Sequence, residues 1–443
     1  MRPALRWPGT GLLTVCLSAL AIPAIAQSET GVQPERPADA LFQRGVATQG
    51  ANTERLALTL GALTSHDANG AGQLLGAERA LAGAAGEFNV GLAYTKPLRK
   101  ALFGASASGG WRHHQEMTDL FASSYAAGAG LTGSITRRAT LGARASYVAS
   151  PYYAFSLFPG PETADPAPAE TPSRDHAITT RRFQSYETGA AFSRTAGAHG
   201  RVNLQAEARR STLEDDPARL LDVVAGGDYN HDVGRSTALR LGYSFRYGET
   251  RSPADRRYTR IHDVDLGFTY RWQRTRTRRT TISLFAGPSM VAEVERERVG
   301  WQASAQVGHM IGRSWTLSGH YRRGVRFVVG FEEPFFADAL SVSLEGLIGE
   351  RWRLTVGGGA ATGEIGIYDV DGHTVNTRSG SAGLQYAVSR HVALFGSYVY
   401  YAYQFGGEVV LPDRELPDLS RSGLRVGMTL WVPLHTRAGH GPR

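Results

Sequence analysis

Apolar and polar residues alternate one by one along most of this chain. In residues 239–247 and 264–272, apolar or aromatic side chains occupy every second position, and Arg, Asp, Ser, Thr or Gly fills the positions between. A period of two places successive side chains on opposite faces of a strand. Each run therefore predicts a β-strand with one apolar and one polar face. Similar runs occur at 56–60, 88–94, 315–321, 340–344, 392–402 and 424–432.

The connections between these runs alternate in length. Short turns are expected at 96–100, 137–138, 311–314 and 389–391, and long polar loops at about 65–81, 151–181, 248–258 and 405–420. A β-meander through a membrane has short periplasmic turns and longer external loops. The pattern predicts an all-β fold, a transmembrane antiparallel up-and-down β-barrel of about 18 strands, with about 16 to 20 acceptable, over residues 53–434.

The N-terminal residues carry the three parts of a secretory signal. Arg2 and Arg6 precede an apolar stretch from Gly11 to Ile22, and small residues follow at 24–26. Because that stretch is too short to span a bilayer, we predict a cleaved signal peptide at 1–26. The polar residues 27–52 are expected to be a periplasmic lead-in, and 435–443 a C-terminal tail.

Composition narrows the protein class further. After the N-terminus, no apolar run of roughly 20 residues occurs, which excludes a helical membrane bundle. Low mean hydropathy, −0.25, does not exclude a barrel, since lipid-facing and lumen-facing residues alternate. The single cysteine, Cys16, lies in the predicted signal peptide, so the mature chain should have no disulfide, thiolate metal site or cysteine nucleophile.

Charge is distributed unevenly over a chain of net charge +8. The short turns are basic and the long loops acidic, which favours charged turns that simply face water, with a basic periplasmic mouth that attracts anionic solutes as the alternative. Nucleic acid is not expected as a partner, because the basic residues sit in separate turns of an exported chain. Aromatic residues fall at strand ends and predict interfacial girdles; they are Tyr94, Trp111, Tyr247, Trp272, Trp315, Trp352 and Tyr403.

Motifs with possible chemistry are weak. Residues 128–133 match a GxGxxG pattern without a following helix, and 369–372 resemble an incomplete calcium loop. His113, His114 and Glu116 lack the spacing that aligns metal ligands. The cluster of His262, Asp263 and Asp265 is the one catalytic candidate, but lumenal charges more often tune permeation. We therefore predict no catalytic residue, cofactor site or metal site, and no enzyme.

Charged residues that share the parity opposite to the apolar set should line the lumen, because a charge facing lipid is costly. The expected lumen-lining residues are Arg240, Arg246, Asp263, Asp265, Arg271, Arg322, Glu345, Arg351, Arg353 and Arg425, with Glu207 and Asp222 as further lumenal acids. Arginines slightly outnumber acids in this set. A lumen that weakly prefers anions or tolerates anionic glycans is the resulting hypothesis.

The last strand, Arg425 to Val432, resembles the C-terminal signal that the barrel assembly machinery reads in outer-membrane proteins. The whole mature chain resembles β-barrel porin families of Gram-negative bacteria, and 150–153, 398–401 and 423–434 resemble barrels of exopolysaccharide gene clusters. The resemblance implies an outer-membrane conduit for secreted polysaccharide. Its implied partners are outer-membrane lipid, the assembly machinery and periplasmic polysaccharide-export proteins. A general diffusion porin, an outer-membrane enzyme and a structural or adhesin barrel remain alternatives.

Overall fold

The computed structural model describes the strands and short turns of the chain. The described residues are 53–68, 83–114, 121–154, 176–213, 219–251, 256–275, 278–293, 297–327, 334–365, 374–406, 410–411, 414–415 and 419–438. The predicted signal peptide and lead-in and the motif at 369–372 lie outside these residues. Within the described residues, no helix is long and apolar enough to cross a membrane.

Strands make up nearly all of this part of the chain. The first ten are β1 (Thr53–Ala68), β2 (Gly83–Pro97), β3 (Ala101–His114), β4 (Phe121–Thr136), β5 (Ala139–Ala154), β6 (His176–Ala196), β7 (Gly200–Leu213), β8 (Arg219–Asp232), β9 (Thr237–Arg251) and β10 (Arg256–Thr275). The rest are β11 (Arg278–Ala292), β12 (Glu297–Ile311), β13 (Trp315–Arg326), β14 (Phe335–Ile348), β15 (Trp352–Ile365), β16 (Thr374–Ala387), β17 (Val392–Gly406), β18 (Val410–Leu411), β19 (Arg414–Glu415) and β20 (Leu419–Ala438).

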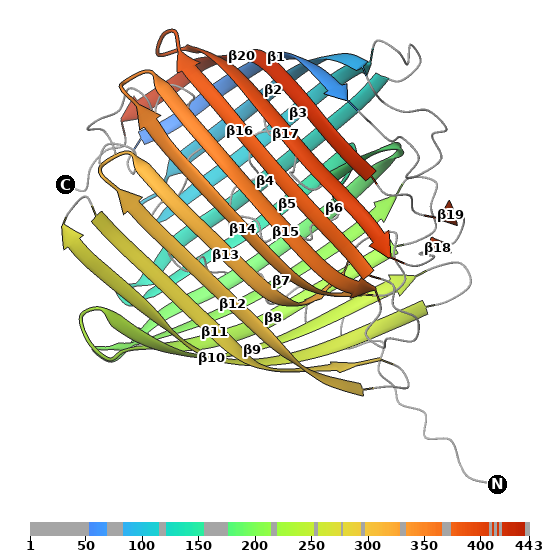
Figure 1. Cartoon of the computed structure of the whole chain (residues 1–443). Helices are drawn as coiled ribbons and strands as arrows, with labels where there is room; N and C mark the ends of the chain where they lie inside the picture. The colour runs from blue at the N-terminus through green and yellow to red at the C-terminus, as the bar shows by residue number, and fades with distance from the viewer. Residues whose placement is uncertain are drawn as a thin grey trace, which may run out of the picture.

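The long strands form one closed antiparallel sheet. It has 18 strands, each paired with its neighbours in the chain, and β1 closes the ring by pairing with β20. The short strands β18 and β19 pair with each other and, among the described residues, with no other strand. Figure 1 shows the tilted strands wrapping around a central axis. The sequence prediction of an up-and-down barrel of about 18 strands is therefore confirmed.

The outer face of the barrel is a belt of exposed apolar side chains. Leu241 of β9 and Leu266 of β10 are direct cross-strand partners, 55% and 66% exposed. Water would disfavour such a continuous apolar surface, whereas lipid hydrocarbon accommodates it. Closed barrels with an even number of antiparallel strands and an apolar band are the outer-membrane type. The protein is accordingly a multi-pass β-barrel of a Gram-negative outer membrane.

One end of the barrel is built from tight turns. Gly197, Gly312 and Gly349 have φ angles of 74°, 69° and 68°, in the turns that follow β6, β12 and β14. Glycine suits these positions because side chains disfavour positive φ. The start of β1 lies beside the β2–β3 turn, which is one of the tight turns of this end (Figure 1). β20 ends there too, because its last residue, Ala438, pairs with Thr53 at the start of β1. The last strand thus runs four residues beyond the predicted barrel boundary at 434, because residues 435–438 pair with β1.

Aromatic pairs brace the outer face near the strand ends. Trp352 and Tyr386 lie 4.5 Å apart between ring centroids, and Phe88 stacks on Trp111 at 6.0 Å. These outward rings agree with the expected girdles. Tyr403 does not belong to them: it is only 1% exposed and shares its face with inward Thr377 and Tyr401, because the parity of β17 turns it to the inside.

Candidate functional site: the charged inner wall

Charged side chains cover much of the inner face of the barrel. Registers place them opposite to the exposed apolar belt. Inner-face arginines include Arg112, Arg144, Arg209, Arg240, Arg246, Arg271, Arg298, Arg322, Arg353 and Arg425. Inner-face acids include Glu87, Glu187, Glu207, Asp222, Asp228, Asp263, Asp265 and Glu345. The described strands thus present more arginines than carboxylates to the lumen.

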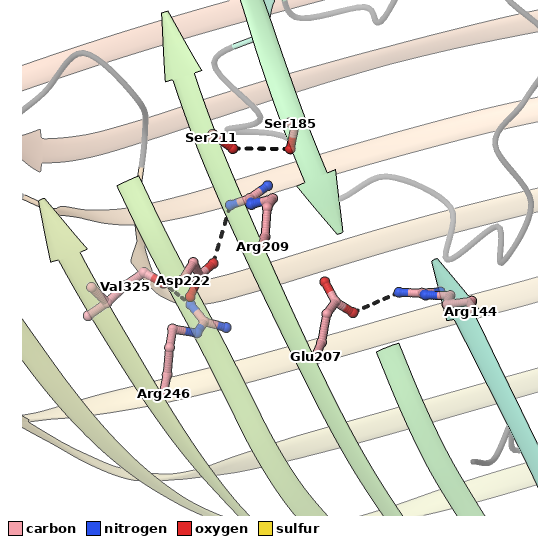
Figure 2. Close-up of polar contacts among 8 residues, drawn as sticks. All are labelled: Arg144, Ser185, Glu207, Arg209, Ser211, Asp222, Arg246 and Val325. Carbon is pink, nitrogen blue, oxygen red and sulfur yellow. Dashed lines mark hydrogen bonds and ion pairs between the residues drawn. The ribbon is translucent and has the colours of Figure 1, made fainter. Parts of the chain in front are cut away.

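Many of these charges are paired along β5 to β8. Arg144 bridges Glu187 and Glu207, with N–O distances of 3.0 Å and 2.7 Å. Arg209 lies 3.2 Å from Asp222 on the next strand. Figure 2 shows Arg144 with Glu207 and Arg209 with Asp222, and a Ser185–Ser211 hydrogen bond beside them. Cross-strand pairs of opposite charge stabilise the sheet and reduce the net field of this wall.

The wall formed by β9 to β13 carries rows of arginines separated by uncharged positions. Along the hydrogen-bonding direction, Arg246 is followed by Ile261, Val291 and Arg298. A second row runs from Arg240 through Gly267, Phe285 and Ser304 to Arg322. Arg240 itself is held by Asp228 at 3.6 Å and Asp265 at 3.5 Å, and its guanidinium lies 4.4 Å above the Phe285 ring.

The end of the β13–β14 hairpin turns into the lumen. We call residues 324–327 and 334–337 the hairpin end. β12 continues to Glu297, but its pairing with β13 stops at Ala303 and Arg323. Phe336 has outward parity on β14, yet its ring lies 6.0 Å from the guanidinium of Arg298 on the inner face of β12. Because an outward side chain of β14 contacts an inward side chain of β12, the hairpin end must lie on the lumen side of β12. A β-carbon placed on inner-face Gly300 would lie 3.8 Å from the same ring.

The hairpin end reaches β9, on the far side of β10, β11 and β12. Arg246 donates a hydrogen bond from Nη1 to the carbonyl oxygen of Val325, at 2.6 Å, as Figure 2 shows. Phe327 packs on Gly248 so closely that a β-carbon at residue 248 would overlap its ring. Among the described residues Arg246 forms no ion pair with a carboxylate, and its guanidinium lies beside the hairpin end. This crossing narrows the lumen at a basic point.

Sequence parity placed most candidate residues on the face that they occupy. Arg240, Arg246, Asp263, Asp265 and Arg271 face inward with their cross-strand partners. The same holds for Arg322, Glu345, Arg353, Arg425, Glu207 and Asp222. Glu345 and Arg353 form an ion pair. Arg351 was expected in the wall but lies exposed in the turn between β14 and β15, since the strand begins only at residue 352.

The sequence analysis did not predict several charged residues of the inner face. Arg144, Arg209, Arg298 and Asp228 lie in strands where small residues obscure the alternation. Counting parity from a neighbouring outward aromatic, such as Tyr147 or Tyr186 for Arg144, would have found them. Arg112 is 3% exposed and donates to Ser65 at 3.0 Å, which no local pattern indicates.

The one candidate catalytic cluster is split by the wall. Asp263 and Asp265 face the lumen, whereas His262 faces outward and its Nδ1 lies 2.9 Å from the hydroxyl of Tyr243. Adjacent residues of a strand cannot act on one site because their side chains point apart. Residues 128–133 form the middle of β4, and His113 is exposed on β3, while Glu116 lies outside the described residues. No group of three potential metal ligands occurs among the described residues.

Comparisons with known proteins give only distant likenesses. No family model matches the chain, and no curated protein matches it. Among solved structures, it is similar to OccAB4 of Acinetobacter baumannii, with 10% identity, TM-score 0.44 and coverage of 87% of this chain and 100% of that one. It is also similar to OccK11 of Pseudomonas aeruginosa, with 9% identity, TM-score 0.42 and coverages of 86% and 96%. The FrpB iron transporter of Neisseria meningitidis gives 7% identity, TM-score 0.45 and coverages of 89% and 83%.

Proposed function

We propose that this protein is an outer-membrane channel for small anionic solutes. The observation that carries the proposal is the basic crossing formed by Arg246 and the hairpin end. A barrel of about 18 strands is wide enough for an aqueous lumen. Charged groups at a narrow point set the field that a permeating ion meets. An arginine at that point that forms no ion pair among the described residues, beside the inner-face arginines of β12 and β13, favours anions over cations.

Reconstitution into planar bilayers tests this proposal. Purified barrels should give discrete conductance steps, and reversal potentials under a salt gradient should show anion preference. Clear cation preference would refute the proposed selectivity. Absence of conductance from folded barrels would refute the channel itself and favour a structural barrel or an enzyme.

Export of a polysaccharide chain is the function that the sequence resemblance implies, and it is a narrower hypothesis. A polymer must thread the whole lumen, so the hairpin end would have to move aside first. Neutral dextrans of increasing size provide the test. Blockage of ion current only by short oligomers supports solute diffusion, whereas translocation of long chains supports export.

A further inference from the structure

The outer face carries a trough beside the place where the hairpin end turns inward. It has a volume of about 310 Å³ and is lined by side chains of β13 to β16. Its lining includes Tyr321, Asp338, Leu340, Ala360, Asn376 and Arg378. The strand registers put all of these side chains on the lipid-facing side. Tyr321, Ala360 and Arg378 lie in one cross-strand row with exposed Leu340, and Asp338 and Asn376 lie in the next row on the same face.

The shape of the trough follows from small side chains. Ala360 lies between Leu340 and Arg378 in one cross-strand row, and Ala402 follows Arg378 on β17. Gly380 is the next outward residue of β16, and a β-carbon placed there would meet nothing within 4 Å. This open, apolar floor lies on a lipid-facing surface, so a segment of an acyl chain can fill it. The chain supplies the dispersion contacts that the lining atoms would lack if the trough were empty.

One side of the trough carries Arg378. Arg378 is exposed, and among the described residues it has no hydrogen bond or ion pair. On the opposite side, the carboxylate of Asp338 already has partners. It accepts a hydrogen bond from the hydroxyl of Tyr321 at 2.6 Å and forms an ion pair with Arg323 at 2.9 Å. That carboxylate therefore does not compensate Arg378.

The level of Arg378 along its strand is the border of the apolar belt. Outward positions from Gly380 to Leu384 are apolar or small, whereas Asn376 on the other side is polar. Lipid phosphates sit at this border, and arginine binds phosphate with two parallel hydrogen bonds. We propose that the trough binds a phosphorylated lipid, with its phosphate on Arg378 and an acyl chain over Ala360 and Leu340.

Native mass spectrometry of the full-length barrel, titrated with phosphatidylglycerol, tests the site. Arg378→Gln should weaken lipid binding by at least about tenfold, as expected for loss of a charge-assisted contact. Ala360→Trp should weaken it as well by filling the floor. Arg210→Gln provides a matched control, because Arg210 is an exposed outward arginine of β7 outside the trough.

Diacylglycerol and inorganic phosphate separate the two parts of the ligand. We expect both to bind much more weakly than phosphatidylglycerol, because each supplies one half of the contacts. The proposal fails if Arg378→Gln has no effect or if Arg210→Gln has the same effect. Inorganic phosphate that displaces the lipid at equal concentration would show a free-anion site instead. Unheated gel mobility confirms that each variant is folded.

Discussion

Arg246 of β9 donates a 2.6 Å hydrogen bond to the carbonyl oxygen of Val325 at the end of β13, across the inner faces of β10, β11 and β12. Neighbouring strands of a barrel exchange backbone hydrogen bonds, but strands this far apart meet only if one leaves the wall. The bond therefore ties an inward-turned hairpin to a strand that lies four positions away in the wall. Permeation properties should depend on it.

The first prediction concerns that bond. Arg246→Ala should raise single-channel conductance and lower anion preference, because a charge-assisted hydrogen bond worth about 1.5–3 kcal/mol is lost and the hairpin end can swing outward. Planar-bilayer recordings measure both effects. Arg271→Ala is the control: Arg271 faces inward but lies near the short-turn end. The same conductance gain in both variants would contradict a special role for Arg246.

The second prediction uses the packing of Phe327 on Gly248. Gly248→Ala should displace the ring and enlarge the conductance in the same direction as Arg246→Ala, because the added methyl group has no room. Gly308→Ala is a matched control on the inner face, where a β-carbon would meet nothing within 4 Å. Unchanged current in Gly248→Ala would mean that Phe327 does not bound the ion path.

The third prediction concerns the ion pairs of Arg240. Asp265→Asn should increase the permeability ratio of anions to cations, because one of the two acids that compensate Arg240 is removed. Reversal potentials in a salt gradient measure the ratio. Glu249→Gln removes a charge on the outer face of β9 and should leave the ratio unchanged. Equal shifts in both variants would point to a general surface-charge effect.

The fourth prediction distinguishes the two faces of β9. Leu241→Arg should destabilise the barrel by up to about 2–4 kcal/mol, since hydrocarbon cannot solvate the guanidinium. Ser244→Arg should be mild, because Ser244 faces the lumen and lies 3.4 Å from a carboxylate oxygen of Asp263. Denaturant unfolding in lipid vesicles gives both values. Similar losses for the two variants would argue for a dry, packed interior.

The local pattern of the sequence was sufficient for the wall of the barrel. Alternation fixes which residues share a face, since side chains of a strand point alternately to its two sides. It correctly separated Leu241 from Arg240 and Leu266 from Asp265. The same rule, applied to His262, already implied that it could not join Asp263 in one site. Strand number followed from the spacing of turns.

Tertiary structure alone decided what those faces contact. The partners of Arg240 and Arg144 depend on strand registers, which pair residues far apart in the chain. The inward turn of the hairpin end breaks the parity rule, because Phe336 has outward parity and still meets the inner face of β12. Local alternation describes a strand that remains in the sheet. Where a strand leaves the sheet, long-range contacts such as Arg246 with Val325 determine its position, and no short segment of sequence encodes them.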